Sequence, residues 1–382
     1  MALVDDRRHE MTFFQKVRNT NWFLIVLICL TASFGLAMLY SVAGGDMNPW
    51  ASRQAVRFSV GVAMMLFVAF IDIRIWLRLA YPLYALGLVL LLIVELMGEI
   101  GMGAQRWLDL GFFNLQPSEV MKIAIVLALA RYFHGLTAED VQRFRWLIIP
   151  IFMAVVPAAL VLVEPDLGTA ILLLMLSSAI LFAAGVLWWK FALVGIAVLG
   201  AIPFAWDRLH DYQRERVLTL FNPERDPLGA GYQIMQSKIA LGSGGIWGKG
   251  FLLGTQSHLN FLPEKHSDFI FTTLGEEFGL VGGLILLGLY AAILVYGFAV
   301  AFRARSQFGR LLATGITTTF FLYVFINIAM VMGLIPVVGV PLPLISWGGS
   351  AMLSILIGFG LLLSVYIHRD IPIPRRPGLD PT

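Results

Sequence analysis

The chain alternates long apolar runs with short polar connections. Most runs are about 20 residues long, the length that a helix needs to cross the hydrocarbon core of a membrane. Helices are expected because a helix satisfies its own backbone hydrogen bonds where no water is present. The runs lie at residues 22–42, 55–73, 76–97, 117–134, 146–163, 168–186, 188–206, 269–301, 308–334 and 346–367. The pattern predicts an all-α polytopic membrane protein with about ten transmembrane helices.

The basic residues predict the orientation of these helices. An even number of spans places both termini on one side, and most Lys and Arg residues of the short connections fall on that side. By the positive-inside rule this side is the cytoplasm. One long extracytoplasmic loop, residues 207–267, then connects spans seven and eight. We expect a cytoplasmic N-terminal tail at 1–21, a transmembrane domain at 22–368 that includes this loop, and a cytoplasmic C-terminal tail at 369–382.

Composition and charge agree with a membrane protein. Hydrophobic residues make up 59% of the chain and charged residues 13%, against about 25% charged residues in soluble domains. The net charge of +3 is explained by the cytoplasmic connections, so we expect no nucleic-acid partner. The single cysteine, Cys29, lies within the first run, which leaves the exposed loops without an intramolecular disulfide.

The stretch LPEKHSDFIFTTLGEEFGLVGG, residues 262–283, is the strongest candidate for chemistry. A charged side chain near hydrocarbon costs about 2.5–3.5 kcal/mol and usually marks a functional site. Asp268 stands at the expected start of a span, where the helix end lowers its pKa and burial raises it. Glu276 and Glu277 follow two turns later and cannot both face the same way. Alternatively, all three acids are structural partners of Arg and Lys on neighbouring helices.

The stretch QPSEVMKIA, residues 116–124, places an acid and a base inside the fourth span. Glu119 precedes Lys122 by three residues, so both side chains share one helical face and can pair. The pair is either an internal staple or the lining of a polar cavity. Arg106, in the preceding connection GAQRWLDLG, is a further cation on the same side.

Three further segments lie at the predicted extracytoplasmic face. EPDLG, residues 164–168, is either a plain turn or part of a polar or metal-binding site near Asp268, because Mg²⁺ and Mn²⁺ prefer acidic oxygens. GSGGIWGKG, residues 242–250, fails the phosphate-loop pattern because Gly250 follows Lys249 where Ser or Thr is required. We expect either a loop that contacts a lipid headgroup or a plain loop. PVVGVPLPLISWGGSAML, with its prolines, predicts a re-entrant segment that lines a cavity.

Six segments together resemble the SEDS family (shape, elongation, division and sporulation). They are GAQRWLDLG, QPSEVMKIA, EPDLG, DPLGAGYQIMQSKIALGSGGIWGKG, LPEKHSDFIFTTLGEEFGLVGG and PVVGVPLPLISWGGSAML, in this order between residues 103 and 353. Within the family, VVGVPLPLISWGGS resembles the RodA type, which serves elongation, more than the FtsW type, which serves division. With the span pattern, the resemblance covers essentially the whole chain.

The resemblance implies a peptidoglycan glycosyltransferase that polymerises lipid II at the outer face of the bacterial cytoplasmic (inner) membrane. Family members work with a class B penicillin-binding protein, and other membrane proteins of the elongation machinery are further expected partners. The family's essential loop Asp maps onto Asp268, and its paired Glu and Lys map onto Glu119 and Lys122.

A mechanism follows in which Asp268 is the general base. The acceptor's sugar hydroxyl attacks a donor glycan linked to undecaprenyl pyrophosphate, and cations stabilise the leaving pyrophosphate. No motif identifies a cofactor, but a divalent cation (Mg or Mn) would serve the same purpose. Residues expected at the substrate are Arg106, Glu119, Lys122, Lys238, Lys249, Lys265 and His266. Residues expected to be structural or cavity-lining are Glu164, Asp166, Glu276, Glu277, Pro341, Pro343, Ser346, Gly348 and Gly349.

Two other classes of function remain open. A lipid II flippase would also use a lateral cavity lined by Glu119 and Lys122, and Asp268 would then be dispensable for polymer synthesis in detergent. A non-catalytic scaffold of the elongation machinery would need partner surfaces but no acids within the membrane. The acids at Glu119, Asp268, Glu276 and Glu277 weigh against a scaffold.

Overall fold

The computed structural model describes most of the chain. The described residues are 11–374 apart from 98, 102–103, 110, 112–113, 207–213, 216–217, 221, 223–224, 227–228, 260 and 263. Parts of the two predicted tails and of the predicted long loop therefore lie outside the described residues.

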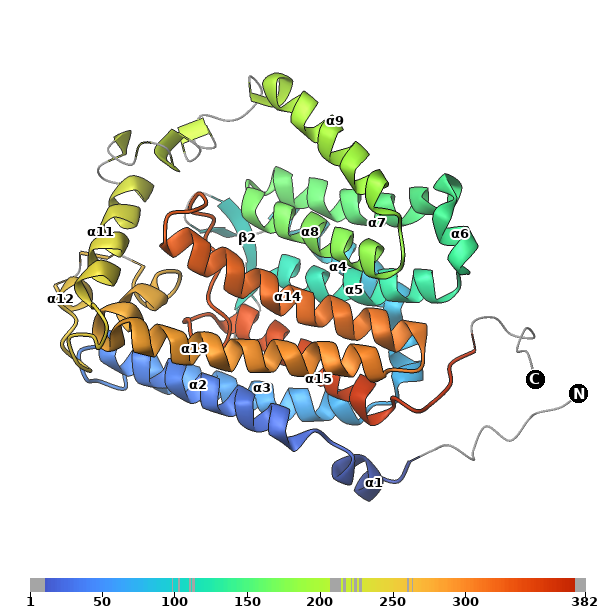
Figure 1. Ribbon diagram of the computed structural model, residues 1–382, viewed down its shortest axis with the longest axis horizontal. Helices are drawn as coiled ribbons and strands as arrows, with labels where there is room; N and C mark the ends of the chain where they lie inside the picture. The colour runs from blue at the N-terminus through green and yellow to red at the C-terminus, as the bar shows by residue number, and fades with distance from the viewer. Residues whose placement is uncertain are drawn as a thin grey trace, which may run out of the picture.

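Long helices form one bundle (Figure 1). Ten helices correspond to the ten predicted apolar runs: α2 (Trp22–Val42), α3 (Ala51–Phe70), α4 (Ile73–Met97), α5 (Pro117–His134), α7 (Phe144–Val163), α8 (Leu167–Ala183), α9 (Trp188–Trp206), α13 (Ile270–Arg303), α14 (Gln307–Val331) and α15 (Gly349–Ile367). The short helix α1 (Phe13–Arg18) precedes them, and the short helices α6 (Ala138–Gln142), α11 (Ala230–Ser243) and α12 (Thr255–His258) lie in connections between them.

Seven of the described helices are long and apolar enough to cross a membrane, namely α2, α3, α4, α7, α13, α14 and α15. Helices α8 and α9 contribute shorter apolar stretches, and α5 carries an acid in its first turn and two basic residues in its last turn. The chain is therefore a multi-pass membrane protein. The number of ten spans stays a prediction.

Local signals explain where several helices begin. Pro117 opens α5, a position where a missing backbone N–H leaves no helical bond unmade. Asp166 caps α8 because its Oδ1 accepts a hydrogen bond from Thr169 N at 3.1 Å. Ser306 caps α14 through a bond from Gly309 N to its Oγ at 3.1 Å. Such caps satisfy N–H groups that the first turn leaves without helical partners.

A small antiparallel sheet lies between α4 and α5 in this otherwise helical fold. Strands β1 (Glu99–Gly101), β2 (Ala104–Asp109) and β3 (Asn114–Leu115) pair in the order β1-β2-β3. In the second pair, Leu108 lies opposite Leu115. Within the segment GAQRWLDLG, residues Ala104–Asp109 form a strand, because pairing with the neighbouring strands satisfies their backbone groups.

Helix α14 lies at the centre of the bundle. It packs against α13, α5, α8 and α15, and 67% of its most apolar stretch is buried, against 28% for α13. Helix α9, in contrast, points away from the bundle above α7 and α8 in Figure 1, and its residues 192–203 are exposed. Polar groups on α14 are therefore well enclosed by protein, as are those on α15, whose most apolar stretch is 72% buried.

The N-terminal and C-terminal parts of the described chain meet at the turn between α3 and α4. Lys16 Nζ donates to Phe70 O at 2.7 Å, and Ser364 Oγ donates to Ile71 O at 2.8 Å. The first and last described segments therefore lie at the same end of the bundle, which agrees with the predicted even number of spans.

Candidate active site

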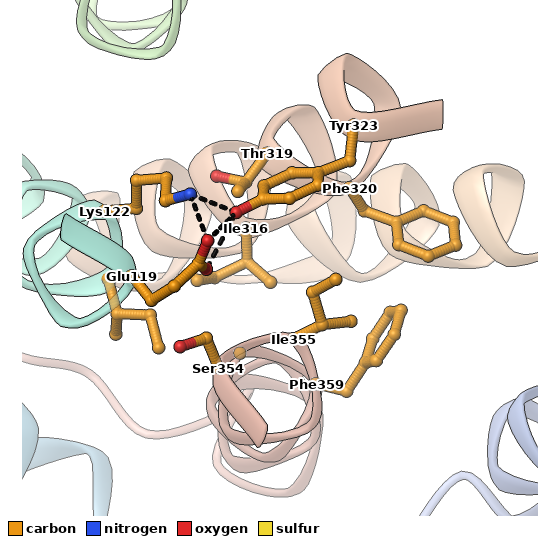
Figure 2. A pocket seen from close by; sticks show the side chains of 11 residues that line it. Glu119, Lys122, Ile316, Thr319, Phe320, Tyr323, Ser354, Ile355 and Phe359 are labelled. Carbon is orange, nitrogen blue, oxygen red and sulfur yellow. Dashed lines mark hydrogen bonds and ion pairs between the residues drawn. The ribbon is translucent and has the colours of Figure 1, made fainter. Parts of the chain in front are cut away.

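A buried acid, a buried lysine and a tyrosine meet where α5 faces α14. Glu119 and Lys122 are 4% and 3% exposed, and Lys122 Nζ lies 2.6 Å from Glu119 Oε1. The Tyr323 hydroxyl donates to Glu119 Oε1 and Oε2 at 2.8 and 2.7 Å and also contacts Lys122 Nζ (Figure 2). The pairing that the three-residue spacing predicts is present, and both charges have partners.

This cluster lines a cavity between α5, α14 and α15, of about 380 Å³. The remaining lining is mostly apolar and includes Ile316, Phe320, Ile355 and Phe359. A cavity with one charged end and apolar walls suits an amphiphilic ligand. The sequence left open whether the Glu119–Lys122 pair is a staple or a cavity lining, and in the structure it is both.

The EPDLG turn is held by Arg106, which lies on β2. Arg106 Nη2 donates to Pro165 O at 2.6 Å, and its Nε lies 3.7 Å from Asp166 Oδ2. Glu164 is 2% exposed, and its Oε1 has no hydrogen-bond partner in the described part of the chain. Burial, reinforced by the charges of Asp166 and Glu95 and opposed by Arg106, raises the pKa of Glu164 to about 8. Glu164 is therefore mostly protonated at pH 7.

A metal site is not evident at this turn. Among the residues that the structure describes, no three His, Cys, Asp or Glu side chains are grouped so as to hold a metal ion. Asp166 already caps α8 and faces Arg106. The predicted divalent cation stays a prediction.

The residue predicted as the base, Asp268, lies just before α13 on a backbone that is held at three successive carbonyl groups. Each carbonyl accepts one hydrogen bond: His266 O from Trp347 N at 2.9 Å, Ser267 O from Ser346 Oγ at 2.6 Å, and Asp268 O from Asn327 Nδ2 at 2.8 Å. The first two donors belong to residues 336–348, which contain no helix or strand and which we call the proline segment. The proline segment and α14 thus fix the backbone that carries Asp268.

The carboxylate of Asp268, in contrast, makes no hydrogen bond or ion pair with a described residue. Its Oδ2 lies against Gly339, where an added Cβ would be 3.4 Å away. Burial, with a further contribution from the charge of Glu264, raises the pKa of Asp268 to about 6. Burial therefore outweighs the helix end, a competition that the sequence did not decide. A pKa close to neutral and a free carboxylate are what general-base catalysis requires.

The two residues that precede Ser267 face inward. Lys265 is 9% exposed and donates to Ser257 O at 2.6 Å. The His266 ring stacks on Trp50, with the ring centroids 4.8 Å apart. Burial lowers the pKa of Lys265 and of His266. Both side chains therefore hold this segment against the rest of the protein.

The proline segment lines a second cavity, of about 200 Å³. Four of the predicted residues line it: Pro341, Pro343, Ser346 and Gly348. Ile355 borders both cavities. Gly349 instead faces Arg57, whose Cζ would lie 3.3 Å from an added Cβ. The segment therefore lines a cavity, as its prolines predict.

Helix α13 is interrupted at Gly279 (φ 63°, ψ −158°), and residues 242–250, which we call the glycine loop, fill the gap. The N–H groups of Lys249 and Gly250 donate to the carbonyls of Glu276 and Glu277, both at 3.0 Å. In return, the glycine loop accepts bonds from the next turn of α13 at 3.0 and 3.1 Å. The glycine loop therefore completes the hydrogen bonding of a broken helix, which is a different role from cradling a phosphate.

The two acids of this turn are held by different partners. Glu276 is fully buried; its Oε1 lies 2.7 Å from Lys249 Nζ and accepts from Thr255 Oγ1 at 2.9 Å. Glu277 contacts Ser41 Oγ and lies 3.5 Å from His258 Nε2. Both acids are structural partners, as in the alternative interpretation, although most of their partners come from the loop that precedes α13.

Lys238 is the most open of the predicted cations. It is exposed on α11 and makes no ion pair with a described residue. Its Nζ lies beside Gly333, 2.8 Å from where a Cβ would be. The adjacent Ser237 Oγ lies 2.8 Å from Thr272 Oγ1, so this part of α11 is near the first turn of α13.

Tyr323 and Asn327 are site residues that the sequence interpretation missed. They lie four residues apart on α14, so they share one helical face. Asn327 is fully buried and Tyr323 is 1% exposed. Polar side chains at this spacing inside an apolar run are a signal that would have identified both residues.

The chain is similar to known proteins along almost its whole length. The model of a cell cycle protein family, FtsW/RodA/SpoVE, matches residues 19–371. Peptidoglycan glycosyltransferase MrdB of Escherichia coli is 44% identical over 368 residues, which are 96% of this chain and 98% of that protein.

Solved structures show the same fold. One is the crystal structure of rod shape determining protein RodA of Thermus thermophilus, with TM-score 0.70, 28% identity, and coverage of 92% of this chain and 98% of that chain. Another is a chain from work on the structural coordination of polymerization and crosslinking by a peptidoglycan synthase complex. Its TM-score is 0.79 and its identity 33%, covering 92% of this chain and 98% of that chain.

Proposed function

The chain belongs to the FtsW/RodA/SpoVE family of cell cycle proteins, and from this membership we propose that it is a RodA-type peptidoglycan glycosyltransferase. It polymerises lipid II into glycan strands during cell elongation. The 44% identity to a protein named peptidoglycan glycosyltransferase MrdB and the likeness to a RodA structure support this activity.

The observation that carries the proposal is the free carboxylate of Asp268 on a firmly held backbone. The same proline segment that anchors this backbone lines the smaller cavity, and Ile355 borders both cavities. A lipid-linked sugar would place its lipid against the apolar walls of the larger cavity and its sugar toward Asp268. Binding at both points orients the reacting atoms.

Asp268 acts as the general base in this proposal. Its ionised carboxylate takes the proton of the acceptor sugar's hydroxyl while that oxygen bonds to the anomeric carbon of the donor. The bond between this carbon and the pyrophosphate oxygen breaks, and the electron pair leaves with undecaprenyl pyrophosphate. The anomeric centre is inverted. A positioned base contributes about 10²- to 10⁴-fold in rate.

Cations stabilise the negative charge that develops on the leaving pyrophosphate. We assign this role first to Lys238, which is exposed and makes no ion pair with a described residue. Arg106 comes second, because its 3.7 Å ion pair with Asp166 is longer than the lysine–glutamate pairs. Lys122 and Lys249 each lie within 2.7 Å of a glutamate oxygen, and Lys265 donates to a backbone carbonyl. A divalent cation would supply further positive charge at the same oxygens.

The membrane setting follows from the same family. We propose that the protein lies in the bacterial inner membrane, with the tails 1–21 and 369–382 in the cytoplasm and the loop 207–267 outside it. Its proposed partners are a class B penicillin-binding protein and other membrane proteins of the elongation machinery. The structural likeness to a chain from work on a synthase complex that coordinates polymerization and crosslinking supports the first of these.

The test uses purified protein with fluorescent lipid II, with and without a class B penicillin-binding protein and with and without Mg²⁺. Glycan products are separated on a gel. We expect ladders from the wild type and from Asp370→Asn, whose side chain is 72% exposed at the opposite end of the bundle. Asp268→Asn, checked for folding by thermal unfolding, should give none.

A second candidate function is transport of lipid II, favoured by the lateral cavity with its buried Glu119–Lys122 pair. If no partner or ion elicits polymer from the wild type, but labelled lipid II crosses proteoliposome membranes that contain it, transport is the function. If Asp268→Asn polymerises as well as the wild type, Asp268 is not the base.

A further inference from the structure

Asn327 connects the three parts of the protein that surround Asp268. It lies on α14 and is fully buried. Its Nδ2 donates to Asp268 O at 2.8 Å and to Val340 O at 2.7 Å. One amide group therefore joins α14, the residue before α13, and the proline segment, and both of its N–H bonds are in use.

The chemistry of these partners determines which way the amide faces. Both partners are carbonyl oxygens, so only the NH₂ group can bond to them; the reversed amide would place Oδ1 against two acceptors. Oδ1 itself is buried and has no hydrogen-bond partner among the described residues. An unsatisfied buried acceptor is unfavourable. The two donated bonds are thus retained although Oδ1 is left without a partner.

The two carbonyls that Asn327 holds both belong to backbone next to the Asp268 side chain. One belongs to Asp268 itself. The other belongs to Val340, which follows Gly339, and Gly339 is the residue against which Asp268 Oδ2 lies. Asn327 therefore sets the position of the Asp268 backbone relative to the backbone that its carboxylate touches.

We propose that Asn327 is a positioning residue for the general base: it acts through Asp268 and does not touch the substrate. This inference rests on the proposed function, in which Asp268 takes the proton. Asn327, Gly339 and Val340 are neutral, so they add no charge beside the Asp268 carboxylate. The charged and titratable neighbours of Asp268 on its own segment are Glu264, Lys265 and His266.

The test compares Asn327→Leu, which keeps the size but removes both donors, with Thr317→Val. Thr317 is a matched control because it is buried on the same helix and its hydroxyl bonds only within α14, to Ala313 O at 2.8 Å. Polymerisation of lipid II is measured across pH, with thermal unfolding of each variant. A misplacement of about 1 Å costs about 10²-fold in rate.

We expect Asn327→Leu to lose about 10²-fold in kcat with the KM for lipid II little changed, and Thr317→Val to stay within about twofold. The acid limb of the pH profile should move to lower pH, because a released carboxylate is better solvated. Asn327→Ser keeps one donor, so its rate should lie between those of the wild type and Asn327→Leu. It replaces Asn327→Leu in the test if that variant does not fold. A loss that only follows the folded fraction, with the acid limb unmoved, would overturn the inference.

A second measurement separates this inference from the proposed function. For each protein, the infrared spectrum of its Asp268→Asn counterpart is subtracted from its own spectrum. The difference isolates the carboxyl stretch of protonated Asp268, and the intensity of this band can be followed against pH without substrate. If the wild type makes no polymer, the proposed function fails, and the infrared titration still decides the positioning role. A titration midpoint that Asn327→Leu leaves unchanged contradicts the role of Asn327.

Discussion

Two acids of the bundle are held in opposite ways. Glu119 is held through its side chain, which accepts bonds from Lys122 at 2.6 Å and from Tyr323 at 2.7 and 2.8 Å. Asp268 is held through its backbone carbonyl, and its carboxylate has no partner among the described residues. Glu119 is 4% exposed, whereas Asp268 is half-buried.

The difference indicates which acid can carry out proton transfer. The carboxylate oxygens of Glu119 are already occupied by Lys122 and Tyr323. The carboxylate of Asp268 has no such donors among the described residues, so its position must come from elsewhere. At Asp268 the position comes from three backbone hydrogen bonds. Glu119 therefore shapes and charges a cavity, while Asp268 is free to react.

The largest expected effect is on the stability of the Glu119 cluster. Lys122→Met leaves Glu119 buried without its cation, and breaking a buried ion pair from one side costs about 3–5 kcal/mol. We expect a large decrease in the thermal unfolding temperature in detergent. The double variant Glu119→Gln with Lys122→Met removes both charges and should recover most of the loss. A single variant as stable as the wild type would mean that Tyr323 alone satisfies Glu119.

The next effect concerns the backbone support of Asp268. Ser346 Oγ donates to Ser267 O at 2.6 Å and accepts from Leu342 N at 2.7 Å. Ser346→Ala leaves a buried donor unsatisfied, which costs about 1–3 kcal/mol. Ser177→Ala is the matched control, because Ser177 is equally buried but bonds only to Leu173 O of its own helix. Equal unfolding temperatures for the two variants would contradict the support role.

The sequence predicts the partners of Glu119 better than the groups that hold Asp268. The Glu119–Lys122 pair follows from three-residue spacing on one helix, which is a local property. The support of Asp268 comes from Asn327, which lies 59 residues from Asp268 along the chain, and from Ser346, which lies 79 residues from Ser267. Such contacts depend on tertiary packing, which a single sequence does not contain. The positions of the seven long apolar helices were predictable because hydrophobicity and length decide them.

Two other features could not be predicted from short sequence segments, because they also depend on tertiary contacts. The break of α13 at Gly279 is completed by the glycine loop, and neither segment alone indicates the other. The small sheet around Arg106 depends on pairing between short strands. In contrast, the helix starts at Pro117 and Asp166 depend only on interactions within one turn.

The pH dependence of polymerisation should report the free carboxylate. Asp268 acts in its ionised form, so below its pKa of about 6 the rate should fall about tenfold for each pH unit. Glu264→Gln removes the like charge that helps to raise this pKa, so its acid limb should lie at lower pH than that of the wild type. Rates measured with lipid II between pH 4.5 and 8 test this. If the acid limb of the pH profile is the same for Glu264→Gln and the wild type, burial is the sole cause of the raised pKa of Asp268.

A change in stability with pH distinguishes the two acids by its sign. The pKa of Asp268 is raised from 3.8 to about 6 on folding, so the folded state binds more protons between these values, and stability falls as pH rises through about 6. Asp268→Asn removes this penalty and should be at least as stable as the wild type at pH 8. The two unfolding temperatures should converge at pH 4.

Asp370→Asn, at an exposed site, should change the unfolding temperature at neither pH. If Asp268→Asn instead unfolds well below the wild type at pH 8, the carboxylate must have a stabilising partner. Asp268 would then be held as Glu119 is, and the reason for assigning proton transfer to one acid and cavity lining to the other would be lost. Inactivity combined with unchanged or higher stability is the outcome that a free catalytic carboxylate requires.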